Sequence, residues 1–185
     1  MLLLEDFLKI GFILLTVGVI AASCFKVKNS AIFLYSMIFI YLVLVLGITL
    51  CPIPYGDVEH IYPAVHNFVP FRTIVSALEG GITLTAMAQI GGNILISAPY
   101  GVYLKAKVKK WKGVSLFLLP LLFPVAVEGL QYLVGITVGV IYRSFDVDDF
   151  ILNLFGVYLG ILCGKMFFIL WRNNSVRRIK NHEIK

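Results

Sequence analysis

Charged side chains are scarce in this sequence. Only 14% of its 185 residues are Asp, Glu, Lys or Arg, whereas 59% are hydrophobic and the mean hydropathy is +0.92. A soluble domain of this length needs far more polar surface to stay in water. The composition therefore excludes an ordinary soluble protein and predicts an integral membrane protein.

Sequence motifs of several enzyme classes are also missing. The chain has no Gly-rich phosphate loop, no His-Glu-x-x-His zinc motif and no Gly-x-Ser-x-Gly nucleophile motif. Its three cysteines, Cys24, Cys51 and Cys163, form no Cys-x-x-Cys pair of the kind that binds zinc or does redox chemistry. We expect no cofactor and no metal. His60 and His66 are too sparse for a metal site and are interpreted as solvated loop residues.

Five apolar segments are long enough to cross a bilayer, which takes about 20 residues. They cover residues 7–25, 31–50, 82–104, 114–134 and 149–171. The sequence therefore predicts an all-α, polytopic membrane helix bundle with about five transmembrane helices. We expect a single transmembrane domain over residues 1–171, followed by a basic cytoplasmic tail over 172–185.

Basic residues predict how this bundle is oriented. Most of the 16 Lys and Arg residues lie in three segments, 26–30, 105–112 and 172–185, which a five-helix topology places on one side. Because short cytoplasmic segments are enriched in Lys and Arg, the N-terminus is expected outside and the C-terminus inside. The basic tail is interpreted as a topology anchor. No aromatic residues are interleaved with its charges, so nucleic-acid binding is not expected.

One long connection, residues 51–81, lies on the predicted outer side. Loops of this length are often functional or partly structured. Within it, Phe71, Ile74, Val75 and Leu78 recur at helical spacing on one face. This pattern predicts a short interfacial helix from Phe71 to Leu78.

Polar residues inside the apolar segments are the most informative feature for function. An unpaired carboxylate in a spanning helix costs on the order of 2.5 kcal/mol or more. Such a group is therefore expected to be paired, protonated or facing a watery cavity. The predicted topology brings the polar residues of three helices, with two from a connecting loop, to the outer half of the membrane. They are Asn93, Glu128, Gln131, Arg143, Asp146, Asp149 and Asn153.

These residues predict a polar intramembrane cavity that opens outward. Arg143 would pair with Asp146, Asp149 or Glu128, which lowers the cost of burying charge. Pairing for structure alone is an equally good interpretation. Asp148 points about 100° away from Asp149 on a helix, so we expect it to face solvent or to cap the helix start.

A stripe of glycines continues from Asp149 and Asn153 along the last helix. Gly156, Gly160 and Gly164 follow at intervals of four residues. Small residues at this spacing let another transmembrane helix approach closely. The stripe therefore predicts a tight helix–helix contact.

Three stretches together resemble the VanZ-like family of bacterial membrane proteins. They are NFVPF at 67–71, GGNILISAPYG at 91–101, and EGLQ at 128–131 followed by RSFDVDDFILNLFGVYLG at 143–160. The resemblance covers residues 35–165. It departs from the family pattern mildly at Ser97-Ala98-Pro99-Tyr100-Gly101, where the family often has an aromatic-Pro-aromatic-Gly sequence.

The resemblance implies a multi-pass protein of the bacterial cytoplasmic membrane with a role in resistance to teicoplanin and other lipid-bearing glycopeptides. It implies membrane lipids as partners, and a lipid-linked wall precursor or a lipoglycopeptide as ligand. An enzyme acting on a lipid-linked head group and a small lipid or drug transporter are the alternatives. The positions that match the family's motifs are Asn67, Pro70, Asn93, Glu128, Gln131, Arg143, Asp146, Asp149 and Asn153, with Phe71, Pro99, Gly101, Gly156 and Gly160 in support.

Overall fold

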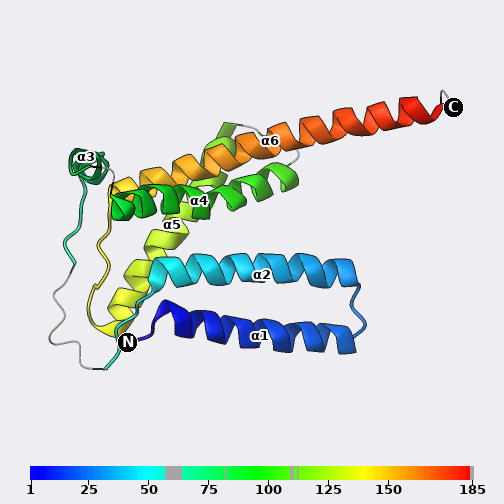
Figure 1. The fold of residues 1–185 in the computed structure, drawn as a ribbon. Coiled ribbons are helices and arrows are strands. Elements are labelled where there is room, and N and C mark those ends of the chain that lie inside the picture. The colour runs from blue at the N-terminus through cyan, green and yellow to red at the C-terminus, as the bar shows by residue number, and fades with distance from the viewer. Residues whose placement is uncertain (57–63, 82, 109–110, 112, 184–185) are drawn as a thin grey trace. The chain divides into compact units, whose positions relative to one another are not determined.

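The computed structural model is built of helices. It describes the backbone of residues 1–56, 64–81, 83–108, 111 and 113–183, and the side chains as far as Arg172. These residues form six helices and no strand (Figure 1). The helices are α1 (Leu4–Cys24), α2 (Asn29–Leu50), α3 (Arg72–Glu79), α4 (Leu84–Lys107), α5 (Gly113–Val138) and α6 (Val147–Glu183).

Four of these helices are long and apolar enough to cross a membrane. They are α1, α2, α5 and the part of α6 from Val147 to Arg172. The all-helical membrane class is thereby confirmed. Helix α4 has 24 residues, enough for a span, but Gln89, Asn93 and Ser97 make it more polar than the other four. A fifth crossing by α4 and the orientation of the bundle stay predictions.

Two helix boundaries differ from the predicted ones for physical reasons. Helix α5 continues past residue 134 and ends at Val138, where Gly139 adopts a φ of 87°, a conformation that glycine accepts without steric cost. Helix α6 runs to Glu183 because no Gly or Pro follows the apolar stretch. At 37 residues it is about 55 Å long, well beyond the roughly 30 Å of a hydrocarbon core. Helix α3 confirms the short helix predicted within 51–81.

The chain divides into two compact units. The first contains residues 1–65 and 129–144. In it α1 and α2 form an antiparallel hairpin (Figure 1). Gly11 of α1 lies against Val43, and Gly47 of α2 lies against Leu4. The backbones of Leu2 and Ile53 exchange two hydrogen bonds of 2.8 and 3.0 Å, which close the open end of the hairpin.

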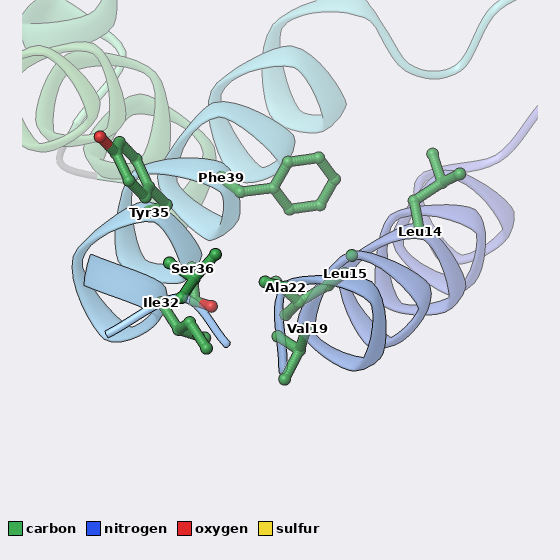
Figure 2. A pocket seen from close by; sticks show the side chains of 10 residues that line it. Leu14, Leu15, Val19, Ala22, Ile32, Tyr35, Ser36 and Phe39 are labelled. Carbon is green, nitrogen blue, oxygen red and sulfur yellow. The ribbon is translucent and has the colours of Figure 1, made fainter. Parts of the chain in front are cut away.

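An apolar groove of about 380 Å³ opens between α1 and α2 (Figure 2). Leu15, Val19 and Ala22 line it from α1, and Ile32, Ser36 and Phe39 line it from α2. No charged side chain lines it. A groove of this composition suits the acyl chains of the bilayer rather than a polar ligand.

The second unit contains residues 66–128 and 145–185, and its core is a contact between α4 and α6. The two helices lie side by side and run in the same direction (Figure 1), as the predicted topology required. A Cβ atom on Gly160 would sit 1.9 Å from the carbonyl oxygen of Ala98, and one on Gly156 would sit 2.1 Å from Ser97 Oγ. On α4, a Cβ on Gly101 would lie 2.0 Å from the carbonyl oxygen of Val157. The close contact predicted from the glycine stripe is confirmed, with α4 as the partner.

The first part of α5 joins this pair through two tyrosines. Tyr158 of α6 donates a hydrogen bond of 3.0 Å to the carbonyl of Leu116. Pro120 has no N–H, so it leaves that carbonyl without its intrahelical donor. Tyr100 of α4 donates to the carbonyl of Leu119, also at 3.0 Å. The Tyr158 hydroxyl thus satisfies the carbonyl that Pro120 leaves free, as a helix in lipid requires.

The close contact at the glycines predicts that a Gly→Ala substitution changes stability differently at two positions. Gly160→Ala should destabilise the protein by on the order of 1–3 kcal/mol, because the new methyl group overlaps the backbone of α4. Gly91→Ala, a matched change where a Cβ meets nothing within 4 Å, should leave stability unchanged or raised, since alanine favours helix more than glycine does. Thermal unfolding of the two purified variants in detergent checks this. Equal midpoints would contradict the close packing of α4 and α6.

Candidate functional site

Polar side chains gather in the second unit at the end where α6 begins. Asn93 of α4 donates from Nδ2 to Asp149 Oδ1 of α6 at 2.7 Å, and both residues are half-buried. Because Asn153 follows Asp149 by four residues, it lies on the same face of α6. That face carries the glycines that contact α4. The sequence-predicted residues Asn93, Asp149 and Asn153 are therefore brought together by the helix pair.

Asn153 is the most unusual member of this group. Its side chain is only 1% exposed, and among the described residues no donor reaches its Oδ1. A buried acceptor without a partner costs about 1–3 kcal/mol. Native proteins seldom keep such a group unless a water, an ion or a ligand satisfies it. Within the described part of the chain, Asn153 Oδ1 therefore offers an acceptor that a water or a ligand can satisfy.

Glu128 belongs to the same region, on the part of α5 that lies in the second unit. It is buried, with 8% of its surface exposed, and the carboxylates of Asp149 and Asp146 are close enough to act on it electrostatically. Among the described residues, none forms an ion pair or a hydrogen bond with Glu128. We call Asn93, Glu128, Asp149 and Asn153 the polar cluster. It is rich in hydrogen-bond acceptors and carries two carboxylates.

Asp146 connects two of the stretches singled out in the sequence. Its carboxylate accepts hydrogen bonds from Asn67 Nδ2 at 2.9 Å and from Thr73 Oγ1 at 2.6 Å. It also accepts from the backbone N–H of Asp148 at 2.9 Å, and so caps the start of α6. The backbone of Asn67 bonds to Phe145 and Val147 at 2.8 and 3.0 Å. Asp146 and Asn67 therefore fix the segment before α3 to the first turn of α6.

Asp148 corrects the sequence-based expectation. It was expected to face solvent or to cap its own helix, yet it is fully buried and caps a different helix. Its carboxylate accepts from the backbone N–H groups of Phe71, Thr73 (2.7 Å) and Ile74 (3.1 Å), at the start of α3. A negative charge at a helix N-terminus is favourable because the free N–H groups there carry partial positive charge.

Sequence reasoning missed Asp148 and Thr73 as parts of the site, although one signal was present. Helix α3 has Phe71 at its N-cap position, and phenylalanine has no side-chain acceptor for the free N–H groups. The acceptor therefore had to come from elsewhere in the chain. Pro70 and Phe71 directly precede α3, and their exposed side chains add no polar group to the site.

Two predicted site residues, Gln131 and Arg143, have their described partners in the first unit. Gln131 Nε2 donates to the carbonyl of Thr49 at 2.8 Å. The Arg143 guanidinium donates to the carbonyls of Cys51 and Ile48. These carbonyls lie in the last turn of α2 and just after it, where a helix lacks internal donors and favours a cation. The described role of both side chains is thus to cap α2, and not the carboxylate pairing expected for Arg143.

Tyr142 joins this capping group and was not singled out from the sequence. Its hydroxyl donates to the carbonyl of Leu50 at 2.9 Å. Burial raises the pKa of the Tyr142 phenol, so the proton that it donates is retained at neutral pH. Burial likewise raises the pKa of the Cys51 thiol, which keeps this buried cysteine protonated and unreactive.

His66 connects the long loop to the segment that precedes α6. His66 is half-buried, and its Nδ1 accepts from the backbone N–H of Phe145 at 2.9 Å, so it is not simply solvated. His60 lies outside the described residues. Within the part of the chain that the structure describes, no group of three or more His, Cys, Asp or Glu side chains could hold a metal ion. Pro99 is exposed on α4, whereas Gly101 is buried against α6.

Comparison with known proteins gives one match. A family model described as VanZ/LLP1 matches residues 37–170, which include every residue of the polar cluster. No curated protein and no solved structure matches the chain.

The Asp148 cap predicts a local change in protection. Asp148→Asn removes the charge and one of the two acceptor oxygens that hold the first N–H groups of α3. Hydrogen bonds to a charged group contribute about 1.5–3 kcal/mol, so amides 71–74 should exchange at least about tenfold faster. Hydrogen exchange with mass spectrometry measures this. Glu79→Gln, an exposed change at the other end of α3, is the matched control, and equal exchange in both variants would contradict the cap.

Proposed function

This chain belongs to the VanZ/LLP1 family, and from that membership we propose that it protects bacteria against teicoplanin and lipid-bearing glycopeptides. It acts in the cytoplasmic membrane by binding a head group of the cell envelope at the polar cluster. The head group belongs to an envelope lipid, a lipid-linked wall precursor or the lipidated drug. The unsatisfied Oδ1 of the buried Asn153 is the observation that carries this proposal.

The depth of the polar cluster supports a head-group ligand. The candidate span of α6 starts with the helix at Val147, and Asn153 lies six residues further on, about 9 Å along the helix axis. Asp149 lies closer to the start. Groups at this depth meet the polar head-group region and the beginning of the acyl chains of a bilayer. With the basic segments inside, this end of α6 is the outer one, where glycopeptides meet their targets.

The chemistry of the polar cluster supports a ligand that donates hydrogen bonds. Asn153 Oδ1 and the Glu128 carboxylate are acceptors with no described donor, and Asp149 adds a second carboxylate beside them. Hydroxyl, amide and ammonium groups complement such a surface. A bare phosphate group would be repelled by the carboxylates. The ligand is therefore an amine, amide or hydroxyl part of an envelope molecule.

A second candidate is an enzyme that acts on the same head group. It is favoured by the electrostatic proximity of Glu128 and Asp149, because two carboxylates with different environments can serve as acid and base. Proteoliposomes supplied with a lipid-linked wall precursor distinguish the two candidates. Product formation that Glu128→Gln abolishes would favour the enzyme, whereas saturable binding without turnover supports the binding protein.

Resistance should depend on the acceptors of the polar cluster. In a deletion strain complemented with variants, Glu128→Gln and Asn153→Leu should each lower the minimal inhibitory concentration of teicoplanin at least about fourfold, toward that of the deletion. Both changes keep the number and branching of side-chain heavy atoms while removing an acceptor or its charge. Glu79→Gln, an exposed carboxylate of α3, is the matched control and should behave as wild type. Full resistance of both cluster variants, at equal membrane levels, would contradict the proposal.

A further inference from the structure

Helix α3 turns an apolar face outward. Val75 is 45% exposed, Leu78 is 58% exposed and Phe71 is 56% exposed, and their spacing of four and three residues puts them on one face. Phe68 and Val69, just before the helix, are also exposed. A helix on the surface of a soluble domain turns this face inward. Here the polar Thr73 faces the protein instead, through its hydrogen bond to Asp146.

The position of α3 along the membrane normal follows from its hydrogen bonds. Asp148, which holds the start of α3, is the second residue of α6, and the candidate membrane span of α6 covers Val147 to Arg172. The backbone bond from Val147 to Asn67 fixes the preceding segment at the same level. This level is where a spanning helix passes from water into hydrocarbon. Helix α3 is therefore held at the boundary between the two.

We propose that Phe68, Val69, Phe71, Val75 and Leu78 form a lipid-docking face that inserts between the head groups and acyl chains of the bilayer. Short helices with one apolar and one polar face bind membranes in this way. A second copy of the chain is a poorer occupant, because a stable protein interface takes about 20–30 residues on each side. The exposed Arg72, in the first turn, can extend its guanidinium toward lipid phosphates.

Lipid docking has a consequence for the second unit. The same Asp148 that holds α3 is next to Asp149, and Asp146 binds both Asn67 and Thr73. When the lipid-docking face of α3 is held in the bilayer, the first turns of α6 are held at a set depth in the membrane. Asp149 and Asn153 lie on these turns. This inference concerns the lipid surface alone and does not depend on which head group the polar cluster binds.

Depth-dependent fluorescence quenching tests the docking face. Exposed Cys24 and Cys163 are replaced by Ser, while the buried Cys51 is kept. A fluorophore is then attached through Val75→Cys or Leu78→Cys in the full-length chain. The protein is reconstituted in phosphatidylcholine–phosphatidylglycerol vesicles whose acyl chains are brominated near the head group. Ser76→Cys is the matched control, because Ser76 is exposed on the same helix about 100° away from Val75.

Labels at 75 and 78 should be quenched at least about twofold more strongly than the label at 76. Equal quenching at the three positions would overturn the proposal. So would unquenched labels at 75 and 78, and intermolecular cross-linking there would identify the face as a contact between copies. Because both substituted side chains are exposed, the fold is retained, and monodisperse elution in detergent verifies it. Resistance measurements are not used, so failure here leaves the proposed function standing.

Discussion

The close contact between α4 and α6 is the constraint on which the second unit depends. Backbone meets backbone at Gly101, Gly156 and Gly160, where even a methyl group has no room. Only at this separation can Asn93 reach Asp149 across the pair. Lipid offers no hydrophobic force between helices, so packing and interhelical hydrogen bonds must hold them together. The glycines and the Asn93–Asp149 bond are therefore two parts of one interaction.

The acidic run from Asp146 to Asp149 is divided among three tasks. Asp146 caps α6 and binds Asn67, Asp148 caps α3, and Asp149 bonds to Asn93 of α4. All three lie at helix N-termini or within the first turn of α6, where the partial positive charge of free N–H groups favours carboxylates. Successive side chains on a helix point about 100° apart, so the three carboxylates face different neighbours. One short stretch thus joins two helices and the segment that precedes α3.

Much of the fold was predictable from the sequence because lipid imposes simple rules. Long apolar runs predicted α1, α2, α4, α5 and α6 as helices, and the spacing of Phe71, Ile74, Val75 and Leu78 predicted α3. The glycine stripe predicted a close helix contact, and the topology predicted that α4 and α6 run in the same direction. These features depend on periodicity within one segment. The candidate span of α6 matches the predicted segment 149–171, but the helix itself continues to Glu183, because helix propensity rather than hydropathy decides where it stops.

The candidate site was predictable only in part, because hydrogen-bond partners depend on geometry between segments. The convergence of Asn93 and Asp149 at one depth was predicted, but their hydrogen bond was not. The burial of Asp148 was not predicted either, since its acceptor role is set by α3, more than 70 residues earlier. Arg143 illustrates the same limit. A guanidinium near carboxylates in sequence suggests an ion pair, yet the free carbonyls at the end of α2 provide its described partners. The positions of charged residues in the sequence do not show that free backbone carbonyls will compete with carboxylates for the guanidinium.

The hydroxyl of Tyr158 on the carbonyl of Leu116 makes Pro120 and Tyr158 interdependent. With proline in place, losing the hydroxyl leaves the Leu116 carbonyl without a donor, whereas with an N–H at position 120 the helix supplies that donor itself. During divergence the proline can therefore be lost first at little cost, whereas losing the tyrosine first leaves an unpaired carbonyl. A sequence that keeps the tyrosine but has lost the proline would record an intermediate step, in which the helix had regained its own bond before the outside donor was discarded.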